Sequence, residues 1–193
     1  RDVLGVAKTA KEAKFIVNSQ ALMIDGKVRN RERSPVGHMD IVEFDGTDIR
    51  YRVQIHSSNK LIAKSITKRE AAYKIAQVTG KRNLRGGKTQ ISLHDGRNIL
   101  LENTDKQVTK IKVQHSLKVN VPSQEIKEIL PLEEGSRVQV TLGHHQGKIG
   151  TVNEINKRFG PKASEVIVHD EKTDEIFRTA LEYVFVIGKL ELD

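Results

Sequence analysis

Apolar residues along this chain come in short runs, and turn residues separate one run from the next. Residues 49–55 alternate strictly between apolar and polar side chains, which predicts a half-buried strand. Its polar positions carry Arg50 and Arg52, so its outer face is expected to be basic. Asp-Gly pairs at Asp25 and Asp95 lie between apolar runs, and such pairs are a strong signal for tight β-hairpins.

Helix signals are few. Two Thr-x-x-Glu capping boxes, which begin at Thr9 and Thr67, predict helices over residues 9–19 and 67–78. Weaker signals concern four other segments. They predict the end of a helix over 1–6, a turn at 57–59, irregular chain over 103–114 and a short helix over 123–130.

From residue 133 onward the pattern is entirely β. Five strands are predicted, at residues 138–142, 148–155, 164–169, 175–179 and 183–187. Strands this short and this closely spaced are typical of a small barrel.

The chain as a whole is therefore expected to be mainly β with α, in the α+β class, with several domains. The expected domains are residues 1–44, residues 45–130 and residues 131–193. The first domain is expected to be truncated at its start, because the chain opens at Arg1 and not at Met.

Positive charge gathers in the first two-thirds of the chain. The net charge is +8, and residues 45–130 alone contain 17 basic and 8 acidic side chains, whereas residues 131–193 contain 8 and 11. A polyanion such as RNA explains this excess, because lysine and arginine set against phosphates release counterions. A merely solubilising surface is the alternative.

Composition also excludes several classes of protein. Cysteine is absent, which rules out disulfides, thiolate zinc sites and thiol nucleophiles, and fits a cytoplasmic location. No apolar run is as long as a membrane span, so no membrane partner is expected. Tryptophan is absent and other aromatic residues are sparse, which argues against a binder of single strands.

The first expected domain, residues 1–44, resembles the S-four RNA-binding domain, also called the alpha-L motif. The resemblance lies in residues 8–16 and 22–28, a short capped helix followed by a hairpin with an Asp-Gly turn. The start of such a helix offers free amides to phosphate. This chain departs from the family at Ala10, where arginine is common, and at Gln20, where glycine is usual. The candidate RNA-binding residues here are Lys8, Lys11, Lys14, Lys27, Arg29, Arg31 and Arg33.

Residues 135–155 resemble a KOW motif, a strand–loop–strand element of ribosomal proteins and transcription elongation factors. Gly143, Gly147 and Gly150 allow the loop positive φ angles and close backbone approach. Lys148 beside Gly147 is the candidate RNA contact of this loop. A plain hairpin loop would carry the same residues.

The middle of the chain holds the strongest basic cluster. Arg82, Arg85 and Lys88 bracket a Gly-Gly pair, where another backbone can come close. Phosphate contacts of this kind position a protein on folded RNA without reading its sequence. With this cluster, the central candidates are Arg50, Arg52, Arg82, Arg85, Lys88 and Arg97.

The order of the modules resembles the S-four-e family of small-subunit ribosomal proteins of archaea and eukaryotes, in its archaeal form. Short stretches of sequence, such as residues 26–29, 93–98 and 182–188, also resemble this family. The resemblance implies a non-catalytic constituent of the cytoplasmic ribosome that binds small-subunit ribosomal RNA, supports assembly and translation and contacts neighbouring ribosomal proteins. We expect a monomer when isolated, with no cofactor and no metal.

Other readings explain less of the chain. His94-Asp95 invites a catalytic interpretation, but no nucleophile or metal ligand set accompanies it, and a tight turn explains the pair. Adjacent His144 and His145 lack further metal ligands at suitable spacing. The alternatives left open are a KOW-containing transcription or RNA-processing factor and an accessory RNA-binding part of an RNA-modifying enzyme.

Overall fold

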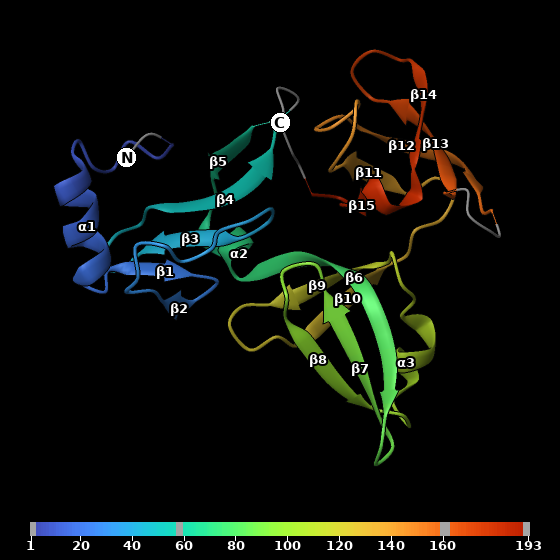
Figure 1. The fold of residues 1–193 in the computed structure, drawn as a ribbon, viewed down its shortest axis with the longest axis horizontal. Helices are drawn as coiled ribbons and strands as arrows, with labels where there is room; N and C mark the ends of the chain where they lie inside the picture. The colour runs from blue at the N-terminus through green and yellow to red at the C-terminus, as the bar shows by residue number, and fades with distance from the viewer. Residues whose placement is uncertain (1–2, 57–59, 159–162, 191–193) are drawn as a thin grey trace. The chain divides into compact units, whose positions relative to one another are not determined.

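The computed structural model describes residues 3–56, 60–158 and 163–190 (Figure 1). The described residues form three five-stranded sheets and a few short helices, so the expected mainly β class with α is confirmed. The chain divides into two compact units. Unit 1 contains residues 1–55, 60–74 and 119–125, and unit 2 contains residues 56–59, 75–118 and 126–193.

Unit 1 is built on the first sheet, whose strand order is β2-β1-β3-β4-β5. Its elements are α1 (Ala10–Asn18), β1 (Leu22–Ile24), β2 (Lys27–Val28), β3 (Ile41–Phe44), β4 (Arg50–Ile55), β5 (Leu61–Ser65) and α2 (Lys68–Ala71). Both predicted capping boxes are present. Asp25 and Gly26 have φ of 50° and 67°, the left-handed conformation that a tight hairpin turn requires.

The first sheet runs across the expected boundary between residues 44 and 45, because β3 pairs with β4. The three-domain division of the chain stays a prediction about which parts fold independently.

Strand β4 is buried more deeply than its alternation predicts. Arg52 and Gln54 are almost completely buried, so the expected basic outer face is wrong at these positions. The reason is tertiary. Helix α2 packs on β4, and Arg52 Nη2 donates to the carbonyls of Glu70 and Tyr73 at 2.8 and 3.0 Å.

The second sheet has the order β10-β9-β6-β7-β8. Its strands are β6 (Tyr73–Leu84), β7 (Lys88–Leu93), β8 (Asn98–Glu102), β9 (Ser116–Asn120) and β10 (Ile126–Leu130), and α3 (Lys106–Lys110) lies between β8 and β9 in the chain. The predicted hairpin at the second Asp-Gly pair is present.

Two helix predictions are wrong. Residues 67–78 form only the single turn α2 before the long strand β6 begins. Residues 75–78 are all buried, and a strand covered on both faces loses the polar alternation that would identify it. Residues 126–130 form strand β10 in place of a helix. Helix α3 lies within residues 103–114, which were expected to be irregular.

The third sheet contains the five predicted C-terminal strands in the order β14-β13-β12-β11-β15. They are β11 (Arg137–Val140), β12 (Ile149–Asn156), β13 (Glu165–Asp170), β14 (Ile176–Ala180) and β15 (Val184–Val186), with a 3-10 turn, η1 (Leu181–Tyr183), before the last. Valines dominate its core. Gln77 Nε2 donates to the Val184 carbonyl at 2.6 Å, which joins the second and third sheets within unit 2.

Residues 3–6 form turns and bends in place of the expected helix end, and residues 1–2 lie outside the described residues. The turn expected at 57–59 also lies outside them. Among the described helices, none combines the length and the hydropathy needed to cross a bilayer.

Candidate nucleic-acid interface

The tip of the β6–β7 hairpin in unit 2 is exposed and basic. Arg82, Arg85 and Lys88 are all exposed there. Neither arginine forms an ion pair with another described residue, and Lys88 is 3.5 Å from Glu102 in a pair that is half-exposed. Gly86 and Gly87 have φ of 83° and 71°, and a Cβ atom at either would meet nothing within 4 Å. The turn backbone is therefore open to a large partner.

Hydrogen bonds at the base of this hairpin hold the tip in place. The buried Thr89 hydroxyl lies 2.9 Å from the side-chain oxygen of Asn83 and 2.6 Å from that of Asn103. The Asn103 amide donates to the Gly87 carbonyl at 2.8 Å. The tip cations thus stand on a fixed frame, which lowers the entropy lost when they bind a rigid surface.

Seven candidate cations of unit 1 are exposed. They are Lys8, Lys11, Lys14, Lys27, Arg29, Arg31 and Arg33. Lys14 forms an exposed ion pair with Glu32 at 2.9 Å, which is worth little in water and is available to a phosphate competitor.

The start of α1 offers phosphate fewer amides than its sequence predicts. The Glu12 carboxylate accepts from the backbone amides of Lys8 and Thr9 at 2.8 and 3.3 Å. The Glu12 amide in turn donates to the Thr9 hydroxyl. Because an internal carboxylate already lies over the start of this helix, the lysine side chains are its main attraction for an anion.

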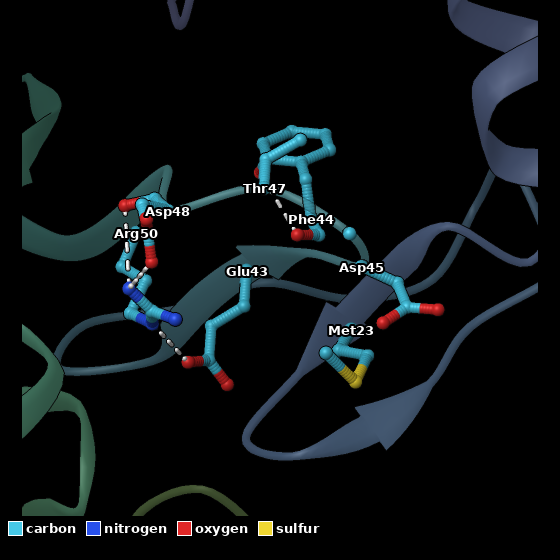
Figure 2. A pocket seen from close by; sticks show the side chains of 8 residues that line it. Met23, Glu43, Phe44, Asp45, Thr47, Asp48 and Arg50 are labelled. Carbon is cyan, nitrogen blue, oxygen red and sulfur yellow. Dashed lines mark hydrogen bonds and ion pairs between the residues drawn. The ribbon is translucent and has the colours of Figure 1, made fainter.

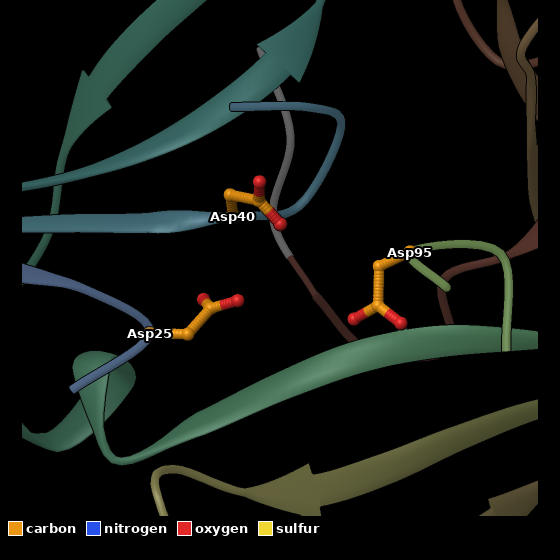
Figure 3. Close-up of side chains that lie close together, drawn as sticks. All are labelled: Asp25, Asp40 and Asp95. Carbon is orange, nitrogen blue, oxygen red and sulfur yellow. The ribbon is translucent and has the colours of Figure 1, made fainter. Parts of the chain in front are cut away.

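A buried cluster of charges fixes the hairpin that carries Lys27. Lys74 is completely buried, and its Nζ lies 3.0 Å from Asp25 Oδ2 and 2.5 Å from Asp40 Oδ1. Figure 3 shows Asp25 in the turn between β1 and β2, and Asp40 just before β3. Asp25 Oδ1 accepts from the Ile41 amide at 2.9 Å, and Asp40 Oδ2 from the Gly37 amide at 2.7 Å.

Sequence reasoning missed this cluster. Lys74 falls in the segment predicted to be a helix, and an Asp-Gly pair indicates a turn without showing that its carboxylate is buried. A lysine at the start of a mostly apolar run, residues 73–78, is the signal that could have indicated a buried cation.

Arg50 and Arg52 are paired with groups inside unit 1. Arg50 Nε lies 3.1 Å from Glu43, and its Nη1 lies 3.3 Å from Asp48, beside a pocket rich in carboxylates (Figure 2). Burial lowers the pKa of the Arg52 guanidinium, and the neighbouring Tyr73 partly offsets this effect. The expected outward orientation of Arg52 is wrong because the carbonyls after α2 take up its donors.

Arg97 and Lys148 are also paired inside unit 2. Arg97 Nε lies 3.1 Å from Asp95, and both side chains are largely buried. Lys148 Nζ lies 3.0 Å from the buried Asp170. Ten of the fourteen candidates are therefore exposed, and the structure separates them into seven on unit 1 and three at the β6–β7 tip.

The glycine-rich loop before β12 is structured by its own contacts. Gly143 and Gly147 have φ of 86° and 84°. The ring of His145 stacks on Phe177 with centroids 4.3 Å apart. Burial, with His144 and Lys148 nearby, lowers the pKa of His145, so this imidazole adds no positive charge at neutral pH.

His94 and Asp95 have structural contacts. His94 Nδ1 accepts from the Gln77 amide at 3.1 Å, and its ring lies edge-on to Phe185. Asp95 Oδ1 accepts from the Arg97 amide, as expected for a tight turn. These contacts agree with the turn interpretation of the His-Asp pair.

Comparison with known proteins identifies the family. The model of ribosomal family S4e matches residues 47–126. Small ribosomal subunit protein eS4 of Ignicoccus hospitalis is 38% identical over 195 residues, covering 99% of this chain and 76% of that protein. The protein of the same name from Methanothermobacter thermautotrophicus is 36% identical, covering 99% and 76%.

A solved structure agrees. The crystal structure of 30S ribosomal protein S4e from Thermoplasma acidophilum has a TM-score of 0.79 and 31% identity, covering 96% of this chain and 89% of that one. With this identity over nearly its whole length, and a fold to match, the chain belongs to ribosomal family S4e.

Proposed function

We propose that this chain is a structural constituent of the small subunit of cytoplasmic ribosomes. It binds small-subunit ribosomal RNA by phosphate and shape recognition and supports subunit assembly and translation. Its relatives are named small ribosomal subunit proteins. The observation that carries the RNA contact is the β6–β7 tip, where Arg82, Arg85 and Lys88 are exposed on a hydrogen-bonded frame.

Three parts of the chain have separate roles in this function. Residues 1–44 act as an alpha-L domain, supported by the capped helix α1 and the β1–β2 hairpin with seven exposed cations. Residues 45–130 supply the basic β6–β7 tip. Residues 131–193 act as a KOW-type barrel, supported by the glycine loop before β12 and the valine core of the third sheet.

The protein acts as a binder and not as an enzyme, as a monomer when isolated, and without a membrane partner or cofactor. Family membership supports the non-catalytic role. The structural contacts of His94 support it as well, because the Gln77 amide takes up one nitrogen of that ring. Neighbouring ribosomal proteins are the other partners.

Binding to purified small-subunit ribosomal RNA, measured from low to high salt, tests the phosphate contact. Each neutralised phosphate contributes about 0.7–0.9 to the slope of log K against log salt, so changing Arg82, Arg85 and Lys88 to alanine should lower that slope by about 2–3. The matched control changes Lys172, Arg178 and Lys189, three exposed cations of the acidic C-terminal part, to alanine.

The two triple variants have the same net charge, so they separate local contact from overall charge. An unchanged slope in the tip variant, or equal changes in both, would show that the tip does not touch phosphate. A sucrose gradient of cell extract gives a second test. The protein should sediment with small subunits, and its absence from those fractions would contradict the proposed function.

A further inference from the structure

Among the phenylalanine and tyrosine side chains that the structure describes, one ring faces solvent. Phe15, on α1, is 73% exposed. No other phenylalanine or tyrosine that the structure describes is exposed, since Phe177 and Phe185 are buried and the rest are half-buried. A phenylalanine left in water forgoes the free energy of burial, and a partner that covers its ring would recover it.

The surroundings of this ring are apolar and basic. It contributes to a shallow pocket lined by Val6, Thr9, Lys11, Glu12, Phe15 and Ile16. Lys11 lies four residues before Phe15, on the same side of the helix, where Cβ atoms are about 5–6 Å apart. Lys8 is also exposed at the start of α1.

The acidic member of the pocket is held by backbone amides at the start of α1. Glu12 directs its carboxylate to the backbone amides of Lys8 and Thr9, so it belongs to the capping box. Lys8 and Lys11 form no ion pair with another described residue.

We propose that Phe15 stacks on an unpaired base of the ribosomal RNA, while Lys8 and Lys11 bind the flanking phosphates. This inference rests on the proposed RNA-binding function. Charge complementarity selects the partner. A ring beside two cations matches a nucleotide, which has a flat π-face and an adjacent negative charge. An apolar protein surface would match the ring but would leave both lysines to be desolvated without partners.

The inference goes beyond phosphate and shape recognition. A base that stacks on a side chain must be outside a continuous duplex, so α1 should sit at a loop, bulge or internal junction of the RNA. Unit 1 thereby selects a local RNA structure, in addition to its non-specific attraction to phosphate.

The chain has no tryptophan, so Phe15→Trp makes a single fluorescent reporter at this position. Titration of the full chain with small-subunit ribosomal RNA should quench this tryptophan in step with binding, because the indole stacks on a base. The matched control is Ile176→Trp, at another exposed apolar position, on β14 in the acidic C-terminal part of unit 2. Its fluorescence should change little.

Affinity measurements separate stacking from simple apolar contact. Phe15→Ala and Phe15→Leu should both weaken RNA binding by roughly 5- to 150-fold, while Phe15→Trp keeps the affinity of the unmodified chain. Phe15→Ala should leave the salt slope unchanged, whereas Lys11→Ala should lower it by about 1. Thermal unfolding of each variant checks that the fold is intact.

Three results would overturn the inference. If the unmodified chain binds RNA but Phe15→Ala and Phe15→Leu bind equally well, the ring does not stack and the proposed function stands. If these two variants keep RNA affinity but no longer sediment with small subunits, the ring contacts a ribosomal protein. If the unmodified chain does not bind ribosomal RNA at all, the proposed function and this inference both fail.

Discussion

Replacing Lys74 with methionine should destabilise unit 1 strongly. The Lys74 side chain is completely buried and lies 3.0 Å from Asp25 and 2.5 Å from Asp40. Methionine has nearly the same length but no charge, so the two buried carboxylates would lose their shared cation. Breaking a buried ion pair by removing one partner costs about 3–5 kcal/mol. Against a typical free energy of unfolding of roughly 5–15 kcal/mol, that is a large fraction.

Guanidinium chloride unfolding, followed by tyrosine fluorescence, measures this loss. Tyr51 and Tyr73 lie in unit 1 and Tyr183 in unit 2, so most of the signal reports on unit 1. Lys14→Met is the matched control, because it breaks the exposed pair with Glu32 and should cost less than about 1 kcal/mol.

A second variant tests the cause of the loss. Changing Asp25 and Asp40 to asparagine together with Lys74→Met removes all three charges but keeps oxygens that accept from the Ile41 and Gly37 amides. Replacing a buried ion pair or triad by neutral groups is often nearly neutral, so this triple variant should recover most of the stability. The reasoning is refuted if Lys74→Met costs no more than Lys14→Met, or if the triple variant is less stable than Lys74→Met alone.

Three further predictions concern packing and charge. Gly150→Ala should lower the thermal unfolding temperature of unit 2, because the new Cβ would lie 2.2 Å from the His169 carbonyl oxygen. Gly80→Ala should be tolerated, because the nearest neighbour of its Cβ would lie at 3.7 Å. Equal effects of the two substitutions would contradict this prediction. Hydrogen bonds from Thr67, the N-cap residue, hold the pKa of the Glu70 carboxyl below its usual 4.5. The ionised carboxylate therefore stabilises the fold fully above pH 4.5, and this stabilisation is lost as the pH falls through the lowered pKa. Glu70→Gln should therefore flatten the decrease in unfolding free energy measured in acid, and an unchanged profile would contradict this. Arg52→Met should change the unfolding free energy measured in denaturant titrations but leave the salt slope of RNA binding unchanged. A lower salt slope would show that Arg52 contacts phosphate.

The elements that the sequence determined are those with local signals. The capping boxes at Thr9 and Thr67 formed as predicted, because each requires only a hydroxyl and a carboxylate three residues apart. The Asp25-Gly26 turn formed because these residues tolerate positive φ. The C-terminal strands were predictable since their alternation survives where one face of a sheet is buried.

Family resemblance and the excess of positive charge were also readable from residues alone. Ten of the fourteen predicted contacts proved to be exposed, including the whole cluster at Arg82, Arg85 and Lys88.

What tertiary structure alone decided is which side chains are buried and which charges are paired. Lys74 lies 49 positions from Asp25 in the chain, and Arg52 lies 18 positions from Glu70, so no local pattern couples them. Residues 73–78 extend as part of β6, where residues 74–78 are all buried, and this tertiary burial overrides the helix start at Thr67. Phe15 is exposed for the same kind of reason. Burial is a property of the elements that surround a residue, and the sequence of α1 does not contain them.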